Sequence, residues 1–165
     1  MTGRYEITLT VNGEPVSAAV EPGEMLVDVL RHSRQLYGCR ESCGQGLCGT
    51  CTVVLDGRAV SSCLMLARLA DGGAVQTVEG LGTPGDLSDV QEAFVREGGF
   101  QCGFCTPGMV VMATQLLREN PDPSDEEIRH YLAGNICRCG AYPEIVRAVR
   151  SVAAQRRGVP GAHAD

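Results

Sequence analysis

The sequence has no tryptophan, and aromatic residues make up only 4% of its 165 residues. A core with so few large rings has to be built from Val, Leu, Ala and Met and from whatever the cysteines hold together. Hydrophobic residues nevertheless reach 44% of the chain, which is typical of folded proteins and not of disordered ones. We therefore expect a globular protein, and a bound inorganic centre would help to stabilise such a core.

Long apolar runs and basic clusters are also missing. No window approaches the roughly 18 apolar residues that a membrane span requires, and the opening residues lack the apolar segment of a secretion signal. The 14 Lys and Arg residues against 20 Asp and Glu leave a net charge of −6, with no basic run interleaved with aromatic residues. We therefore expect a cytoplasmic protein with no membrane span and no nucleic-acid partner.

Cysteine, in contrast, is abundant. Disulfides are disfavoured in the cytoplasm, so clustered thiols there indicate metal or redox chemistry more often than covalent cross-links. Eight of the nine cysteines fall into two groups of four, and one is left over. The nine positions are Cys39, Cys43, Cys48, Cys51, Cys63, Cys102, Cys105, Cys137 and Cys139.

The first half of the chain has the pattern of a small sheet. Apolar and polar residues alternate from Tyr5 to Val11 and lead into Asn12-Gly13, a dipeptide suited to a tight hairpin turn. This pattern predicts a mixed sheet with one helix across it. The other elements expected here are a helix at 25–30, two strands joined at Asp56-Gly57 within 51–63, and a last strand at 74–80.

The pattern changes at about Leu81, where a Gly- and Pro-rich connector begins and strand alternation ends. Four helix starts are indicated by capping boxes or early prolines: Ser88 with Gln91, Thr106 with Pro107, Ser124 with Glu127, and Tyr142 with Pro143. The sequence thus predicts an α+β protein. Its expected parts are a sheet domain at 1–80, a linker at 81–86, a four-helix bundle at 87–155 and a tail at 156–165.

Two cysteine pairs are expected on turns of the helical half. They directly follow Gly98-Gly99 and Gly134, which stand where helices should stop. Two turns at the same end of a bundle can meet, so the four thiols could converge on one centre. A stripe of apolar residues at helical spacing is predicted to be ordinary core; it consists of Met109, Met112, Ala113 and Leu116.

Three cysteines crowd the glycine-rich stretch CGQGLCGTC. Cys43, Cys48 and Cys51, with Cys63 after eleven intervening residues, have the spacing of a plant-type two-iron, two-sulfur ferredoxin cluster. Glycines let backbone N–H groups approach cluster sulfur closely, because they lack a Cβ. A structural zinc site is the alternative, but zinc usually takes its four cysteines as two compact pairs.

The second group consists of Cys102, Cys105, Cys137 and Cys139. By itself it leaves zinc, a second iron–sulfur cluster and a redox-active dithiol open. Joined to the first motif, it closely resembles the iron–sulfur small subunit of the xanthine oxidase family of molybdenum hydroxylases, such as carbon monoxide dehydrogenase and bacterial aldehyde, nicotine or isoquinoline dehydrogenases. The resemblance spans about residues 4 to 153 and rests on ESCGQGLCGTCTVVLDGRAVSSC, GGFQCGFCTPGMV and GNICRCGAYPEIV.

This resemblance implies two 2Fe-2S clusters. The first would lie in a β-grasp ferredoxin-like domain on Cys43, Cys48, Cys51 and Cys63. The second would lie in the helical domain on Cys102, Cys105, Cys137 and Cys139. The resemblance also implies that Gln101 and Cys139 approach a molybdopterin on a partner subunit.

The resemblance implies partners as well. A large subunit would carry molybdopterin cytosine dinucleotide and a medium subunit would carry FAD, in a dimer of heterotrimers. Electrons would pass from molybdenum through both clusters to FAD. Nothing in the sequence resembles a substrate site, so this chain is expected to conduct electrons and to have no catalytic residue of its own.

The remaining candidate residues have simpler interpretations. Cys39 as the first ligand would leave a gap of eight residues to Cys48, so we predict that it is a small core thiol. The scattered histidines His32, His130 and His163 are predicted to lie on the surface. A stand-alone ferredoxin is the rival function, but a simple shuttle needs only the first cysteine motif.

Overall fold

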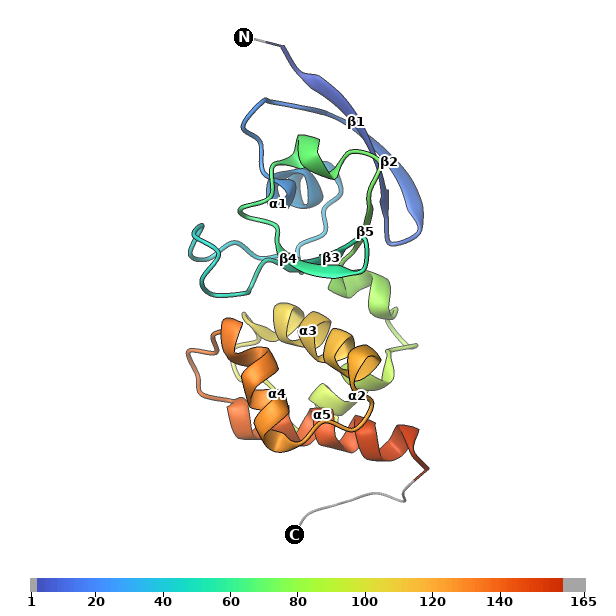
Figure 1. Cartoon of the computed structure of the whole chain (residues 1–165), viewed down its shortest axis with the longest axis vertical. Helices are drawn as coiled ribbons and strands as arrows, with labels where there is room; N and C mark the ends of the chain where they lie inside the picture. The colour runs from blue at the N-terminus through green and yellow to red at the C-terminus, as the bar shows by residue number, and fades with distance from the viewer. Residues whose placement is uncertain (1–2, 159–165) are drawn as a thin grey trace.

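The computed structural model describes residues 3–158 and places a sheet half and a helical half one after the other along the long axis (Figure 1). Each half contains its own cluster of buried hydrophobic side chains. Leu9, Leu26 and Val53 belong to the cluster of the sheet half, and Phe94, Met109 and Ile145 belong to that of the helical half. The expected α+β class is confirmed.

A five-stranded mixed sheet forms the first half. Strands β1 (Tyr5–Val11) and β2 (Glu14–Val20) make an antiparallel hairpin. Its turn uses positive φ angles at Asn12 (52°) and Gly13 (89°), as the Asn-Gly dipeptide predicted. The sheet order is β2-β1-β5-β3-β4, in which only β1 and β5 are parallel. The other strands are β3 (Thr52–Leu55), β4 (Arg58–Ser61) and β5 (Ala74–Gln76).

The helix expected at 25–30 is present as a single short turn followed by a wider one. Helix α1 (Leu26–Asp28) continues into the π-helical turn η1 (Val29–Ser33). Its apolar residues Leu26, Val29 and Leu30 are fully buried in the core of the sheet half. Two short 3-10 turns, η2 (Ala67–Ala70) and η3 (Val78–Leu81), flank β5 and lead to the second half.

The helical half begins where the capping boxes predicted. Ser88 and Ser124 cap α2 (Asp89–Arg96) and α4 (Asp125–Tyr131), and in each case the third helical residue closes the box. The others are α3 (Thr106–Glu119), the short 3-10 turn η4 (Leu132–Gly134) and α5 (Tyr142–Arg156). No helix within residues 3–158 is both long and apolar enough to cross a membrane.

The two helix starts marked by proline were each predicted one residue too late, because Cys105 and Ala141, and not Thr106 and Tyr142, take the capping positions. Thr106 was expected to cap α3, but the helix already begins at Thr106 and Cys105 takes the capping position without a side-chain hydrogen bond. The Thr106 hydroxyl is buried, with no hydrogen-bond partner among the described residues. The cysteine pair thus leads directly into the helix, so α3 fixes the position of Cys105.

Helix α3 joins the two halves. It lies against β3, at the face of the sheet half that meets the helices (Figure 1). Two of its side chains bond to the sheet half: Gln115 Nε2 donates to Gly57 O (3.0 Å) and Arg118 Nη1 donates to Gln76 Oε1 (3.1 Å). Its predicted core stripe is confirmed, because Met109, Ala113 and Leu116 are buried and Met112 packs against the same cluster.

Candidate functional site

The first cysteine loop lies between η1 and β3, where the chain has no regular secondary structure. Gly44, Gly46 and Gly49 take left-handed φ angles of 61°, 70° and 67°, which side chains with a Cβ rarely adopt. These turns aim backbone amides inward. The N–H groups of Gln45 and Leu47 both donate to Cys43 Sγ at 3.4 Å.

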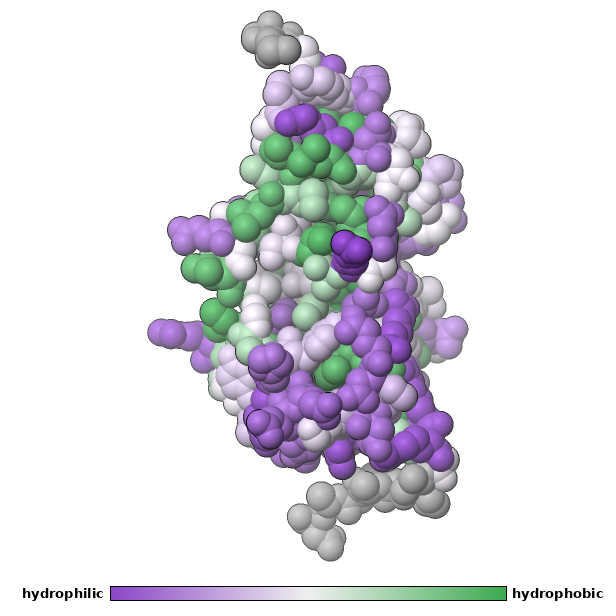
Figure 2. Space-filling model, viewed as in Figure 1, coloured by the Kyte–Doolittle hydropathy of each residue, from purple (hydrophilic) through white to green (hydrophobic). Residues whose placement is uncertain are grey.

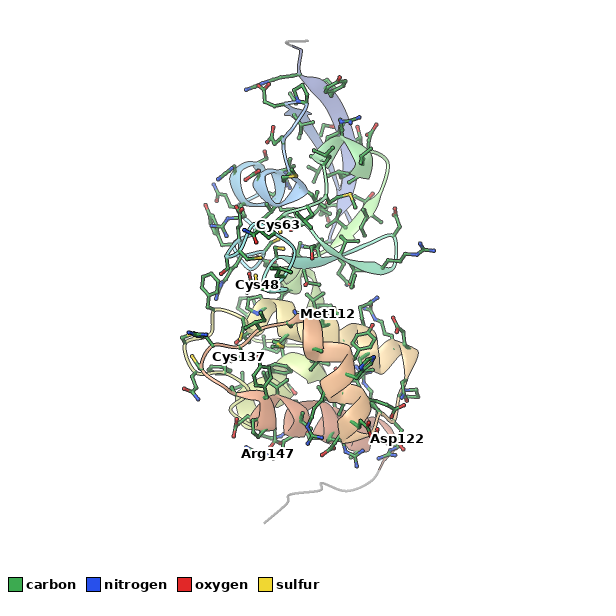
Figure 3. The ribbon with its side chains drawn as sticks, turned by 60° about the vertical axis from the view of Figure 1, so that its left-hand side comes forward. Cys48, Cys63, Met112, Asp122, Cys137 and Arg147 are labelled. Atoms are coloured by element: carbon green, nitrogen blue, oxygen red, sulfur yellow. The ribbon has the colours of Figure 1, made fainter. Side chains whose placement is uncertain are left out.

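The four thiols of this first group lie as two pairs. The Gln45 and Leu47 amides, and then the Cys48 thiol, lower the pKa of Cys43 to about 6. Burial, and then the neighbouring Cys51 thiol, raises the pKa of Cys63 to about 11. The sulfur of Cys43 therefore lies near that of Cys48, and the sulfur of Cys63 lies near that of Cys51. Figure 3 shows Cys48 and Cys63 in the part of the sheet half that approaches the helices.

The second group lies on two turns of the helical half. Cys102 and Cys105 precede α3, and Cys137 and Cys139 precede α5. The Phe104 amide, and then the Cys139 thiol, lower the pKa of Cys102. Burial, and then Cys137, raise the pKa of Cys105 to about 12. The two turns therefore meet, and their thiols again form two pairs.

Each group brings four thiols near one another, which is the ligand set that a cluster of two irons requires. Within residues 3–158, no group of three or more His, Cys, Asp or Glu side chains is arranged to hold one metal ion. A two-iron cluster instead takes two cysteines at each iron. Thiolates also need compensation for their charge, and the amides directed at Cys43 supply part of it.

The two cysteine loops contact each other directly. Ile136 N donates to Cys48 O (2.9 Å), and Asn135 Nδ2 donates to Gly49 O (2.9 Å). Asn135 is only 4% exposed, so the second bond is shielded from water. Sequence reasoning missed these contacts, because no local pattern relates residues so far apart in the chain. The first of them joins Ile136, the residue before Cys137, to the backbone of Cys48.

The two turns that carry Gln101 and Cys139 face outward at one place. Both residues are exposed, and Gln101 Nε2 lies 3.4 Å from Cys139 O. Exposed apolar side chains belong to the same two turns; they are Phe100, Phe104, Ile136 and Tyr142, each between 39% and 49% exposed. Behind them, the Tyr142 hydroxyl accepts a hydrogen bond from Cys137 N (2.9 Å). The two residues predicted to approach a cofactor thus share one accessible surface.

A second exposed apolar area lies on the sheet half. Leu47 is 65% exposed and Leu64 is 56% exposed, and both flank Gly46 in the first cysteine loop. In Figure 2 apolar side chains are visible over the sheet half and along its junction with the helices, whereas the helical half is largely polar on this face. Apolar surface is thus exposed beside each cysteine group.

The leftover residues lie where the sequence predicted. Cys39 is 2% exposed, its sulfur is 3.1 Å from Ser62 Oγ, and burial raises its pKa to about 12. It is therefore a core thiol, as predicted. His32 and His130 are exposed, as predicted, and His163 lies outside the described residues.

Comparison with known proteins relates both halves to iron–sulfur domains. A 2Fe-2S iron-sulfur cluster binding domain matches residues 9–77, and a second family, a 2Fe-2S binding domain, matches residues 77–150. The chain is 49% identical over 146 residues to the nicotine 6-hydroxylase small subunit of Paenarthrobacter nicotinovorans, covering 88% of each chain. It is 46% identical over 147 residues to the nicotinate dehydrogenase small FeS subunit of Eubacterium barkeri, covering 89% of this chain and 94% of that protein.

Solved structures agree with these relatives. Quinoline 2-oxidoreductase of Pseudomonas putida 86 has a chain that is 43% identical, with a TM-score of 0.89 over 95% of this chain and 99% of that one. Aldehyde oxidoreductase of Desulfovibrio desulfuricans is 45% identical with the same TM-score, but this chain covers only 17% of it. The chain therefore belongs to the iron–sulfur subunits of the xanthine oxidase family of molybdenum hydroxylases and is a component of an oxidoreductase complex.

Proposed function

We propose that this chain carries two 2Fe-2S clusters and conducts electrons between a molybdopterin on one partner and FAD on another. The observation that carries the proposal is the direct contact between the two cysteine loops, through Ile136 N and Cys48 O. A carrier that only docked to a reductase would not need a second group of four cysteines in contact with the first group. The relay therefore explains the contact better than a stand-alone ferredoxin does.

The eight paired thiols supply the ligands in this proposal. Cys43, Cys48, Cys51 and Cys63 would hold the first cluster, and Cys102, Cys105, Cys137 and Cys139 would hold the second. Each cluster, when bound, takes up and gives up one electron at a time. The chain itself keeps the ligands fixed, directs amides at sulfur and excludes bulk water between the loops.

The bonding between the loops favours electron transfer between these groups. From Cys137 the chain runs through one peptide bond to Ile136, whose N–H is bonded to the carbonyl of Cys48. Asn135, buried beside it, holds the Gly49 carbonyl in place. The connection between the ligand groups is therefore short, rigid and built from backbone atoms, so surface substitutions should leave it unchanged.

We further propose the domain limits that the sequence predicted: a β-grasp domain at 1–80, a linker at 81–86, a four-helix bundle at 87–155 and a tail at 156–165. The separate hydrophobic clusters of the two halves support this division. The tail lies largely outside the described residues. Within the complex, each half would contribute one cluster and one docking surface.

The two exposed apolar areas suggest how the partners are arranged. The two turns with Gln101 and Cys139 would face a large subunit that binds molybdopterin cytosine dinucleotide. The area around Leu47 and Leu64 would face a medium subunit that binds FAD. The complex would be a dimer of heterotrimers in the cytoplasm. This chain would contribute no substrate-binding residue to it.

Metal analysis and spectroscopy of the purified chain test the proposal. Fully loaded protein should contain about four irons and an equal amount of acid-labile sulfide, as two 2Fe-2S clusters require. Reduction should then produce two paramagnetic resonance signals with different relaxation rates. A single signal that integrates to one spin would show that the chain carries one cluster, as a ferredoxin does. Zinc without sulfide would show a structural metal site and contradict the proposal.

Replacing Gln101 by leucine tests the surface proposed to face molybdopterin. The amide of Gln101 can both donate and accept hydrogen bonds at the polar edge of a pterin, and leucine cannot. In the reconstituted complex, Gln101→Leu should keep both clusters but slow their reduction by substrate about tenfold, measured as stopped-flow bleaching of cluster absorbance. A tenfold change corresponds to about 1.4 kcal/mol, which is the range of one hydrogen bond.

Two controls make this experiment specific. Gln155→Leu makes the same exchange at an exposed position near the end of α5 and should bleach at the wild-type rate. Dithionite should reduce all three proteins equally, because it bypasses the partner. Substrate-driven bleaching of Gln101→Leu at the wild-type rate, with equal partner affinity, would exclude Gln101 from the cofactor contact.

A further inference from the structure

Arg40 belongs to the first cysteine loop by its backbone. Its amide donates to Thr50 O (3.2 Å), and its carbonyl accepts a hydrogen bond from Thr50 Oγ1 (2.8 Å). Thr50 is 4% exposed and lies between Cys48 and Cys51. The start of the Arg40 side chain is thus fixed by the loop proposed to hold the first cluster.

The side chain of Arg40 reaches the other cysteine group. Its Nη1 donates to Gly103 O at 2.6 Å, and its guanidinium carbon lies 5.4 Å from the centre of the Phe104 ring. Gly103 and Phe104 are the two residues between Cys102 and Cys105. Arginine stacks on aromatic faces and donates in a fixed plane, so these two contacts together fix the position of its charge.

The charge of Arg40 is not neutralised locally. Among the described residues, no carboxylate lies within salt-bridge distance of it. The residue is half-buried, so its field is less screened by salt than that of an exposed residue such as Arg138 between Cys137 and Cys139. A positive charge from the sheet half therefore stands beside a turn of the helical half.

We propose that Arg40 sets the reduction potential of the cluster in the helical half and positions the Cys102–Cys105 turn. This inference rests on the proposed function, because it assumes that a cluster is bound there. A reduced cluster carries one more negative charge than an oxidised one, so a nearby cation stabilises the reduced form and raises the potential. The first cysteine loop would thus tune the second cluster through one side chain.

Redox titration of the full, cluster-loaded chain, followed by paramagnetic resonance, tests the inference. Arg40→Met and Arg40→Gln remove the charge and should lower the midpoint potential of the helical cluster, with a smaller shift of the other cluster. Arg40→Lys keeps the charge and should restore most of the potential. The shift should persist at raised ionic strength, because the guanidinium is half-buried.

Arg118→Met is the matched control. Arg118 also donates across the junction, to Gln76 Oε1 at 3.1 Å, so its replacement removes the same charge and a similar bond. It lies about 18 Å further along α3, at 1.5 Å per residue, from the end that carries Cys105. Both potentials should stay at their wild-type values in this variant.

The possible outcomes separate this inference from the proposed function. Wild-type protein with one cluster signal would refute the function before any variant is made. Two signals with unchanged potentials in Arg40→Met and Arg40→Gln, or equal shifts of both clusters, would overturn the role of Arg40. If the neutral variants lose the helical cluster, the Arg40→Lys variant distinguishes the two explanations. An Arg40→Lys protein that binds the helical cluster at the wild-type potential supports the inference. An Arg40→Lys protein that also loses this cluster overturns the electrostatic role of Arg40.

Discussion

Replacing Cys137 by serine is expected to remove the helical cluster and leave the other cluster in place. Serine is a poor substitute for thiolate at iron, and each cysteine group belongs to its own half of the chain, so iron content should fall by about half. Cys48→Ser should have the reverse effect and remove only the cluster of the sheet half. Iron and sulfide analysis, with paramagnetic resonance of the reduced protein, would measure both losses.

Cys39→Ser is the control for these variants. Cys39 is buried and its sulfur lies near Ser62 Oγ and Cys51 O, so the substitution keeps a small polar group in the same contacts. Both clusters should remain. Loss of a cluster in Cys39→Ser, or loss of both signals in each single ligand variant, would show that the assignment of ligands to loops is wrong.

Gly108→Ala is expected to destabilise the junction between the halves. Gly108 lies in the first turn of α3 and is buried against the first cysteine loop, where an added Cβ would overlap the carbonyl oxygen of Gly49. A backbone atom cannot move aside as the end of a flexible side chain can. Overpacking of this kind costs about 2 kcal/mol, which for a chain of this size lowers Tm by about 4–8 °C.

Thermal unfolding followed by circular dichroism would measure this effect. Gly134→Ala provides the matched control, because an added Cβ there meets nothing within 4 Å and its φ is not in the left-handed region. Its Tm should stay within about 2 °C of the wild type. Equal Tm values for Gly108→Ala and Gly134→Ala would mean that α3 can shift away from the loop without cost.

Much of the fold depends on short-range signals, which is why it could be predicted. The Asn12-Gly13 turn, the capping boxes at Ser88 and Ser124 and the apolar stripe of α3 each depend on residues within a few positions of one another. The start of α3 was missed by one residue. Tertiary packing, and not a capping side chain, decides where that helix begins, because Cys105 has no capping hydrogen bond.

The sequence by itself determined that eight cysteines form two groups of four, and for the first group the spacing and the intervening glycines predict the ligands of a cluster. Only the tertiary structure decided how the groups meet. The bonds from Arg40 to Gly103 and from Asn135 to Gly49 join residues 63 and 86 positions apart. Two of these partners are backbone carbonyls, which every residue has, so no sequence pattern marks them. They became partners because α3 packs on β3 closely enough to bring the cysteine loops together.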